Sequence, residues 1–147
     1  MPSLLTSTPA HPLLTPLLTL ASWTFVMELW MYALRIPALS KYKVPISPDM
    51  TTADMNKNIP RHLQWPADNY NHLMEQPTVF YAVALALDRL EVGDSVAVGL
   101  AWTYVGLRVV HSVVQAAANP VMVRFQIFAC SSVVLLLMTG KGVLAVM

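Results

Sequence analysis

Ionisable side chains lie inside several otherwise apolar stretches of this 147-residue chain. Glu28 is the only charged residue among the first 34. Arg108 and His111 interrupt a second apolar stretch, and Arg124 lies early in a third. An ionised group inside a bilayer costs about 3 kcal/mol on insertion scales, so each of these residues needs a partner and is a candidate for a functional role.

Further polar residues repeat at the spacing of an α-helix. Residues three, four or seven positions apart project from one helical face. This spacing puts two sets of polar residues on single faces: Asn71, His72 and Glu75 on one, and Arg108, His111 and Gln115 on the other.

The depths of these residues along their helices are also similar. At about 1.5 Å per residue, Glu28 lies about 10 Å, Glu75 about 9 Å and His111 about 10 Å from the nearer end of the predicted helix. Arg124 lies about 6 Å and Arg108 about 15 Å from such an end. We therefore expect one nearly neutral layer of two carboxylates and two guanidiniums. Such a layer is either a binding site or a structural ion-pair network that aligns the helices.

The composition is that of a membrane protein. Hydrophobic residues make up 56% of the chain and charged residues 12%, against about 25% charged residues in soluble domains. A mean hydropathy of +0.54 also excludes a disordered chain. The net charge of +1 provides no basic surface for phosphates, so no nucleic-acid partner is expected. The single cysteine, Cys130, is expected to be an inert core residue.

The apolar stretches predict four membrane-spanning helices and one long loop. The second helix is the weakest prediction, because its uninterrupted apolar run is only about ten residues, whereas a span needs about 20. Prolines in the loop limit any helix there to a turn or two. A signal peptide is the competing interpretation of the first stretch, which lacks a basic start and an Ala-x-Ala site. The predicted fold is an all-α, integral membrane four-helix bundle with spans at about 13–35, 69–88, 95–118 and 121–144, and a loop at about 36–68.

The basic residues predict how the chain is oriented. Five of the nine Lys and Arg residues lie between Arg35 and Arg61, and none precedes the first predicted helix. Positively charged loops stay in the cytoplasm. We therefore expect the long loop to be cytoplasmic and both termini to lie outside.

Several other kinds of site have little support in the sequence. A metal site in a helical bundle needs repeated Glu-x-x-His pairs, and the chain has one reversed pair, His72 and Glu75, with His111 as a potential third ligand. No metal is therefore expected. The chain also has no glycine-rich phosphate loop, no Gly-x-Ser-x-Gly motif and no pair of cysteines.

The order of these features resembles the MAPEG family, the membrane-associated proteins in eicosanoid and glutathione metabolism. Asn71-His72-Leu73-Met74-Glu75, followed by Phe80, is similar to the family signature Asn-x-x-Glu-x-x-x-x-Phe. Arg108-Val-Val-His111 is similar to the Arg-x-x-His/Tyr run of the third helix. Arg124 is similar to the arginine that family members use on glutathione.

The resemblance implies a homotrimer with ligand sites between neighbouring subunits that open to the cytoplasm. It also implies that Arg124 stabilises the glutathione thiolate, while Arg35, Glu75 and His111 hold the tripeptide. The candidate site is therefore Arg124 as the catalytic residue, with Glu28, Arg35, Asn71, His72, Glu75, Arg108, His111 and Gln115 as ligand-binding residues.

The chain also departs from the family pattern. Gln115 and Phe128 stand where enzymes of the family often carry tyrosines. Either His72 stands where the signature has asparagine, or Asn71 is that asparagine displaced by one residue. Asp68 and Asn71 stand where some members place arginines. These departures weaken the case for glutathione and leave an apolar ligand or substrate open.

Three functions follow as hypotheses. The first is a glutathione- or thiol-dependent transferase or peroxidase that acts on an apolar electrophile. The second is a non-catalytic subunit that binds membrane lipid or assembles with a partner. The third is a proton-coupled transporter based on Glu28. Arg108 and Arg124 argue against the third, because nearby cations keep a carboxylate ionised.

Overall fold

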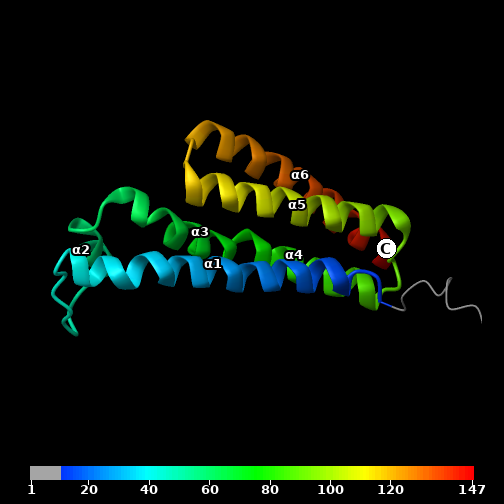
Figure 1. Cartoon of the computed structure of the whole chain (residues 1–147). Helices are drawn as coiled ribbons and strands as arrows, with labels where there is room; N and C mark the ends of the chain where they lie inside the picture. The colour runs from blue at the N-terminus through cyan, green and yellow to red at the C-terminus, as the bar shows by residue number, and fades with distance from the viewer. Residues whose placement is uncertain (1–10) are drawn as a thin grey trace, which may run out of the picture.

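The computed structural model describes residues 11–147, and no β-strand occurs among them. The long helix α1 packs against α3 and α4, and a hairpin of α5 and α6 lies on these helices (Figure 1). The turn between α5 and α6 points toward the end of the molecule that carries the loop after α1, but α1 and the loop extend well beyond it (Figure 1). The helices are α1 (Leu14–Lys41), α2 (Thr52–Lys57), a 3-10 turn η1 (Arg61–Leu63), α3 (Trp65–Leu73), α4 (Gln76–Arg89), α5 (Ser95–Ala117) and α6 (Val121–Val146).

The second predicted span is two helices rather than one. α3 ends at Leu73 and α4 begins at Gln76, and Glu75 between them has a non-helical backbone with φ −91° and ψ −102°. Pro77 explains the break, because its ring lacks an N–H group and clashes with the carbonyl of the residue four positions earlier, which is Leu73. The proline is instead accommodated in the first turn of α4.

The loop is shorter than the predicted range 36–68. α1 continues to Lys41 with Pro37 inside it, and η1 and α3 begin well before residue 69. The short helix α2 inside the loop has a capping box. The Thr51 side chain accepts a hydrogen bond from the Asp54 backbone, and the Asp54 carboxylate accepts one from the Thr51 backbone.

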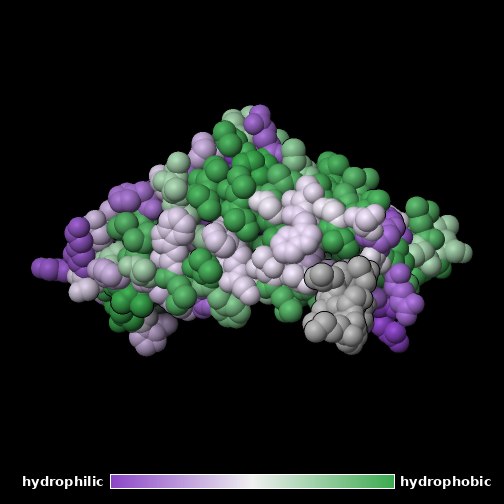
Figure 2. Space-filling model, turned by 45° about the vertical axis from the view of Figure 1, so that its right-hand side comes forward, coloured by the Kyte–Doolittle hydropathy of each residue, from purple (hydrophilic) through white to green (hydrophobic). Residues whose placement is uncertain are grey.

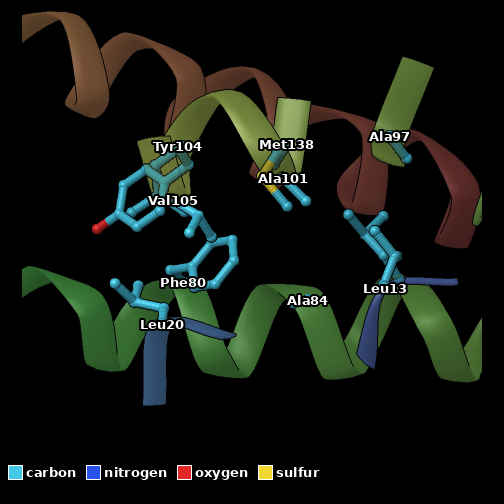
Figure 3. Close-up of a cluster of buried hydrophobic side chains, with 11 residues drawn as sticks. Leu13, Leu20, Phe80, Ala84, Ala97, Ala101, Tyr104, Val105 and Met138 are labelled. Carbon is cyan, nitrogen blue, oxygen red and sulfur yellow. The ribbon is translucent and has the colours of Figure 1, made fainter. Parts of the chain in front are cut away.

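The centre of the molecule is a closely packed apolar core that draws on all four long elements. The rings of Phe80 on α4 and Tyr104 on α5 are stacked with centroids 4.5 Å apart. Leu20 from α1 and Met138 from α6 are fully buried in the same cluster (Figure 3). Since lipid is as apolar as these side chains, close van der Waals packing rather than exclusion of water holds such a core together in a bilayer.

The outer faces of the helices are apolar. Hydrophobic side chains cover much of the middle of the molecule, and hydrophilic residues gather toward its ends (Figure 2). Among residues 11–147, α1, α5 and α6 are each long and apolar enough to cross a membrane. α4 has 14 residues and needs α3 to complete a crossing. Cys130 lies exposed on α6, so its predicted place in the core is wrong.

Candidate functional site

Arg108 lies at the centre of a polar cluster between α3, α5 and α6. Its side chain is fully buried, and its Nη2 donates a 3.2 Å hydrogen bond to the carbonyl oxygen of His72. His72 is in the last turn of α3, where carbonyl groups lack the regular partner four residues on and carry partial negative charge. Its carbonyl oxygen also accepts a long 3.4 Å hydrogen bond from the backbone N–H of Glu75. The break after α3 therefore provides the acceptor that holds the guanidinium.

The cluster has more hydrogen-bonding capacity than the chain satisfies. Within residues 11–147, Nε and Nη1 of Arg108 have no acceptor, and Nδ1 of His111 has no partner. Ser112 Oγ beside them is equally without a partner in this part of the chain. Leaving such a group buried and unpaired costs about 1–3 kcal/mol, and more for a charged group. These side chains fit a ligand that carries anionic oxygen or sulfur acceptors.

Two histidines and a phenylalanine form the wall beside Arg108. The rings of His72 and His111 have centroids 5.1 Å apart, and the Phe128 ring lies 5.2 Å from His72. The guanidinium carbon of Arg108 is 5.7 Å from the centre of the Phe128 ring, within cation–π range. The side chain next to the guanidinium is therefore a phenyl ring, which has no hydroxyl group to donate or accept a hydrogen bond.

Glu75 brings a carboxylate to the edge of this cluster. Its Oε2 is 2.7 Å from Nδ1 of His72, and its side chain is 66% exposed. The exposed carboxylate oxygens remain available to an ammonium group. Within residues 11–147, no group of three or more His, Cys, Asp and Glu side chains is arranged to hold a metal ion.

Arg124 lies in the first turn of α6. Its Nη1 donates to the Oδ1 of Asn119, whose positive φ of 55° forms the tight turn between α5 and α6. Nε of Arg124 has no partner among the described residues. The turn therefore holds a second cation at the start of α6, four residues before Phe128, whose ring lies next to Arg108.

Gln115 is bound to α3 by Asn69, a residue that was not predicted to belong to the site. Asn69 on α3 donates from Nδ2 to Oε1 of Gln115 on α5 at 3.0 Å, and both side chains are buried. Asn69 Oδ1 has no donor in the described chain. Asn69 could have been predicted, because it lies three residues before His72 and residues i and i+3 share a helical face.

Three of the residues predicted to bind the ligand do not contact the cluster around Arg108 in the same chain. Glu28 accepts a 3.0 Å hydrogen bond from the hydroxyl of Tyr32 and forms no ion pair with Arg108 or Arg124. Arg35 donates to Met55 Sδ and Asn56 Oδ1 in the loop. Asn71 is exposed. The single layer expected from the depths of the residues is therefore divided, because equal depth does not put residues on facing sides of their helices.

A second network lies just beyond the break and was not foreseen. Gln76, the first residue of α4, donates from Nε2 to Oγ of Ser132 at 2.7 Å. Its Oε1 accepts from the Tyr104 hydroxyl at 3.4 Å and from the Ser131 hydroxyl at 3.5 Å. One amide therefore ties the start of α4 to both α5 and α6, next to the candidate site.

A sequence model of the MAPEG family matches residues 13–144, which is nearly the whole chain. The protein belongs to the MAPEG family, and the resemblance seen in the sequence is confirmed. It is thus an integral membrane protein of a family associated with glutathione and eicosanoid metabolism. No curated protein and no solved structure matches the chain significantly.

Proposed function

We propose that this protein binds glutathione or a related thiol at the cluster around Arg108 and transfers it to an apolar electrophile, or uses it to reduce a peroxide. The observation that carries the proposal is the fully buried guanidinium of Arg108, which has two N–H directions without an acceptor in residues 11–147. Such donors match a carboxylate better than a neutral lipid chain, because charge-assisted hydrogen bonds are the strong ones.

The charges around the cluster suit the parts of a tripeptide thiol. Arg108 and His111 provide donors for a carboxylate, and the exposed carboxylate of Glu75 provides acceptors for an amine. Asn69 and Gln115 add amide groups on the α3 side. In its own chain Arg35 is bound to the loop, so we assign it to the site of a neighbouring subunit in a homotrimer.

We assign the stabilisation of the thiolate to Arg124. Glutathione, when bound, supplies the sulfur nucleophile. A guanidinium in a poorly solvated place lowers the free energy of a thiolate relative to the thiol, and the thiolate is the reactive form. The thiol proton leaves to water, a carbon–sulfur bond forms, and the leaving group of the electrophile departs with the bonding electron pair. Apolar helix faces around the site give a membrane-dissolved electrophile access from the lipid.

Conjugation of glutathione to a chlorodinitrobenzene by the purified protein in lipid nanodiscs tests this proposal. We expect Arg124→Ala to lower the rate at least tenfold. Arg89→Ala is the matched control, since Arg89 is an exposed residue at the far end of α4. Equal rates in the wild type, in Arg124→Ala and in protein-free nanodiscs would contradict a catalytic role.

The second candidate is a non-catalytic subunit that binds lipid or a protein partner. The Phe128 ring favours it, because this ring lies against Arg108 and offers no hydroxyl group to a bound sulfur. A role in assembly predicts that loss of Arg108 disperses the oligomer, whereas a binding role predicts an intact oligomer that no longer binds glutathione.

A further inference from the structure

Glu75 belongs to the start of α4, although its side chain contacts α3. The Glu75 carbonyl oxygen accepts two hydrogen bonds from Thr78, at 3.1 Å from the backbone N–H and at 2.6 Å from the hydroxyl. The N–H group of Glu75 makes only a long bond of 3.4 Å to the His72 carbonyl oxygen, which also accepts from Arg108. The position of the Glu75 carboxylate therefore depends on where α4 begins relative to α3.

The side-chain amide of Gln76 fixes the start of α4 against α6. Its Nε2 donates to the Ser132 hydroxyl at 2.7 Å, and this hydroxyl donates in turn to the Phe128 carbonyl oxygen at 2.9 Å. One hydroxyl can accept and donate at the same time, so the two bonds form a continuous chain. Inside a bilayer no water replaces such partners, so the link between the two helices is not readily exchanged.

Both ends of this hydrogen-bond chain lie at the cluster around Arg108. Glu75 directly precedes Gln76, and the Phe128 ring lies 5.2 Å from the His72 ring and 5.7 Å from the guanidinium carbon of Arg108. Within residues 11–147, the Gln76 side chain itself bonds to residues outside the cluster, namely Ser131, Ser132 and Tyr104. Gln76 therefore acts on the site through its neighbours rather than by direct contact.

We propose that Gln76 is a positioning residue, whose link to Ser132 keeps the Glu75 carboxylate in place for the ammonium group of a tripeptide thiol. This inference rests on the proposed function, in which Glu75 provides acceptors for that amine. A binding group that is misplaced by about 1 Å loses much of its effect, so loss of the link should weaken recognition of the amine. Among residues 11–147, Arg124 makes no hydrogen bond to this network, so stabilisation of the thiolate should not change.

Two ligands separate recognition of the amine from the rest of the site. One is glutathione, and the other is deaminated glutathione, in which a hydrogen atom replaces the amine and both carboxylates remain. Isothermal titration of the full-length protein in lipid nanodiscs measures both affinities. We expect Gln76→Leu and Ser132→Ala to lower the affinity for glutathione about three- to tenfold, and the affinity for the deaminated compound by less than about twofold.

Thr139→Val is the matched control. The Thr139 hydroxyl donates to the Leu135 carbonyl oxygen at 2.8 Å within α6, as the Ser132 hydroxyl does to Phe128, but in the described chain it has no partner on another helix. This variant should change neither affinity, and thiolate absorbance at saturating glutathione should persist in Gln76→Leu.

A double variant shows whether Gln76 acts through Glu75. Addition of Gln76→Leu to Glu75→Gln should lower the affinity for glutathione by less than about a further twofold, because the carboxylate through which Gln76 acts is then absent. A further loss as large as that in the wild-type background would contradict the inference.

Three other results would overturn the inference and leave thiol binding intact. One is an equal loss of affinity for both ligands in Gln76→Leu, which would indicate a structural role only, and another is an unchanged affinity for glutathione. The third is equal affinity of the wild type for both ligands. The absence of glutathione binding by the wild type would instead overturn the proposed function and this inference with it. If Gln76→Leu does not fold, Ser132→Ala and Gln76→Glu, which keeps the acceptor and loses the amide donor, decide.

Discussion

Within residues 11–147, the buried guanidinium of Arg108 makes one hydrogen bond, whereas such a group can donate five. A purely structural arginine of this kind gains little, since replacing buried ion pairs by apolar residues is often neutral or stabilising. A ligand that accepts hydrogen bonds from the remaining N–H groups would compensate for the burial of the charge.

We expect Arg108→Leu to keep the free energy of unfolding within about 1 kcal/mol of the wild type while glutathione affinity falls about 10- to 100-fold. The physical reason is that charge-assisted hydrogen bonds contribute about 1.5–3 kcal/mol each, whereas an apolar replacement leaves no buried charge. Glutathione-dependent thermal stabilisation measures the affinity. Arg89→Leu serves as the exposed control. If Arg108→Leu is unfolded, or if its oligomer dissociates, Arg108 has a structural role instead.

Sequence spacing predicted part of the cluster. Arg108 and His111 share the face of α5 that meets α3. His72 and Glu75 are in contact at 2.7 Å, but not on one helical face as expected, because the chain leaves the helix between them. Glu28 could not be placed in this way, because depth along a helix does not specify the direction in which a side chain points. The hydrogen bonds of Asn69 and Gln76 depend on how separate helices pack, which no local pattern contains.

At the scale of helices, Pro77 and Gln76 together define the break beside the site. The apolar periodicity predicted one continuous span, and the proline was the signal against it. For the loop, the prolines predicted that any helix would be limited to a turn or two, and α2 has six residues. The capping box of Thr51 and Asp54 was not predicted, although their spacing is that of such a box.

Gln76→Leu should lower the free energy of unfolding by about 0.6–1.7 kcal/mol, from the average to the largest value measured for interhelical hydrogen bonds in a membrane protein. The variant removes the bond from Gln76 to Ser132 and leaves the Tyr104 hydroxyl without its acceptor. Reversible unfolding in mixed micelles measures the change. Gln126→Leu, at an exposed position of α6, is the matched control and should have no effect. Equal stability of the two variants would show that the network contributes nothing.

The cap of α2 should titrate at unusually low pH. Hydrogen bonds from Lys57 and then Thr51 hold the pKa of Asp54 at about 2, below its ordinary value of 3.8. Because the folded pKa is lowered, the contribution of the cap is fully present above about pH 4 and is lost as the pH falls through about 2.

Carboxyl-carbon NMR of Asp54 checks this expectation. The midpoint should lie at about 2 in the wild type and move toward 3.8 in Lys57→Met. Lys43→Met alters another exposed lysine of the loop and should leave the midpoint unchanged. A wild-type midpoint near 3.8 would mean that the cap does not form in solution.

At the scale of the whole molecule, the apolar outer faces and the family both place the protein in a membrane. Composition alone predicted this class, because a chain that is 56% hydrophobic and 12% charged cannot cover itself with water-compatible side chains. The association of subunits could not be derived from one chain, since lipid and a neighbouring subunit are equally apolar surroundings for α1 and α6.

We expect the purified protein to be a homotrimer with its long loop in the cytoplasm. Native mass spectrometry of the protein released from detergent should give three times the 16.2 kDa chain mass. Because Cys130 is the only cysteine, Asn58→Cys in a Cys130→Ser background introduces one reactive site into the loop. An impermeant thiol reagent should label it only from the cytoplasmic side. Labelling from the other side would reverse the assigned orientation.

The central claim is that the cluster around Arg108, His111 and Arg124 binds and activates a thiol. The most direct measurement is the ultraviolet difference spectrum of the protein in lipid nanodiscs with glutathione at neutral pH, which detects thiolate absorbance. We predict a thiolate signal that saturates with glutathione, disappears in Arg124→Ala and persists in Arg89→Ala. No signal from the wild type, together with no thermal stabilisation by glutathione, would contradict the claim and favour the lipid-binding or assembly function.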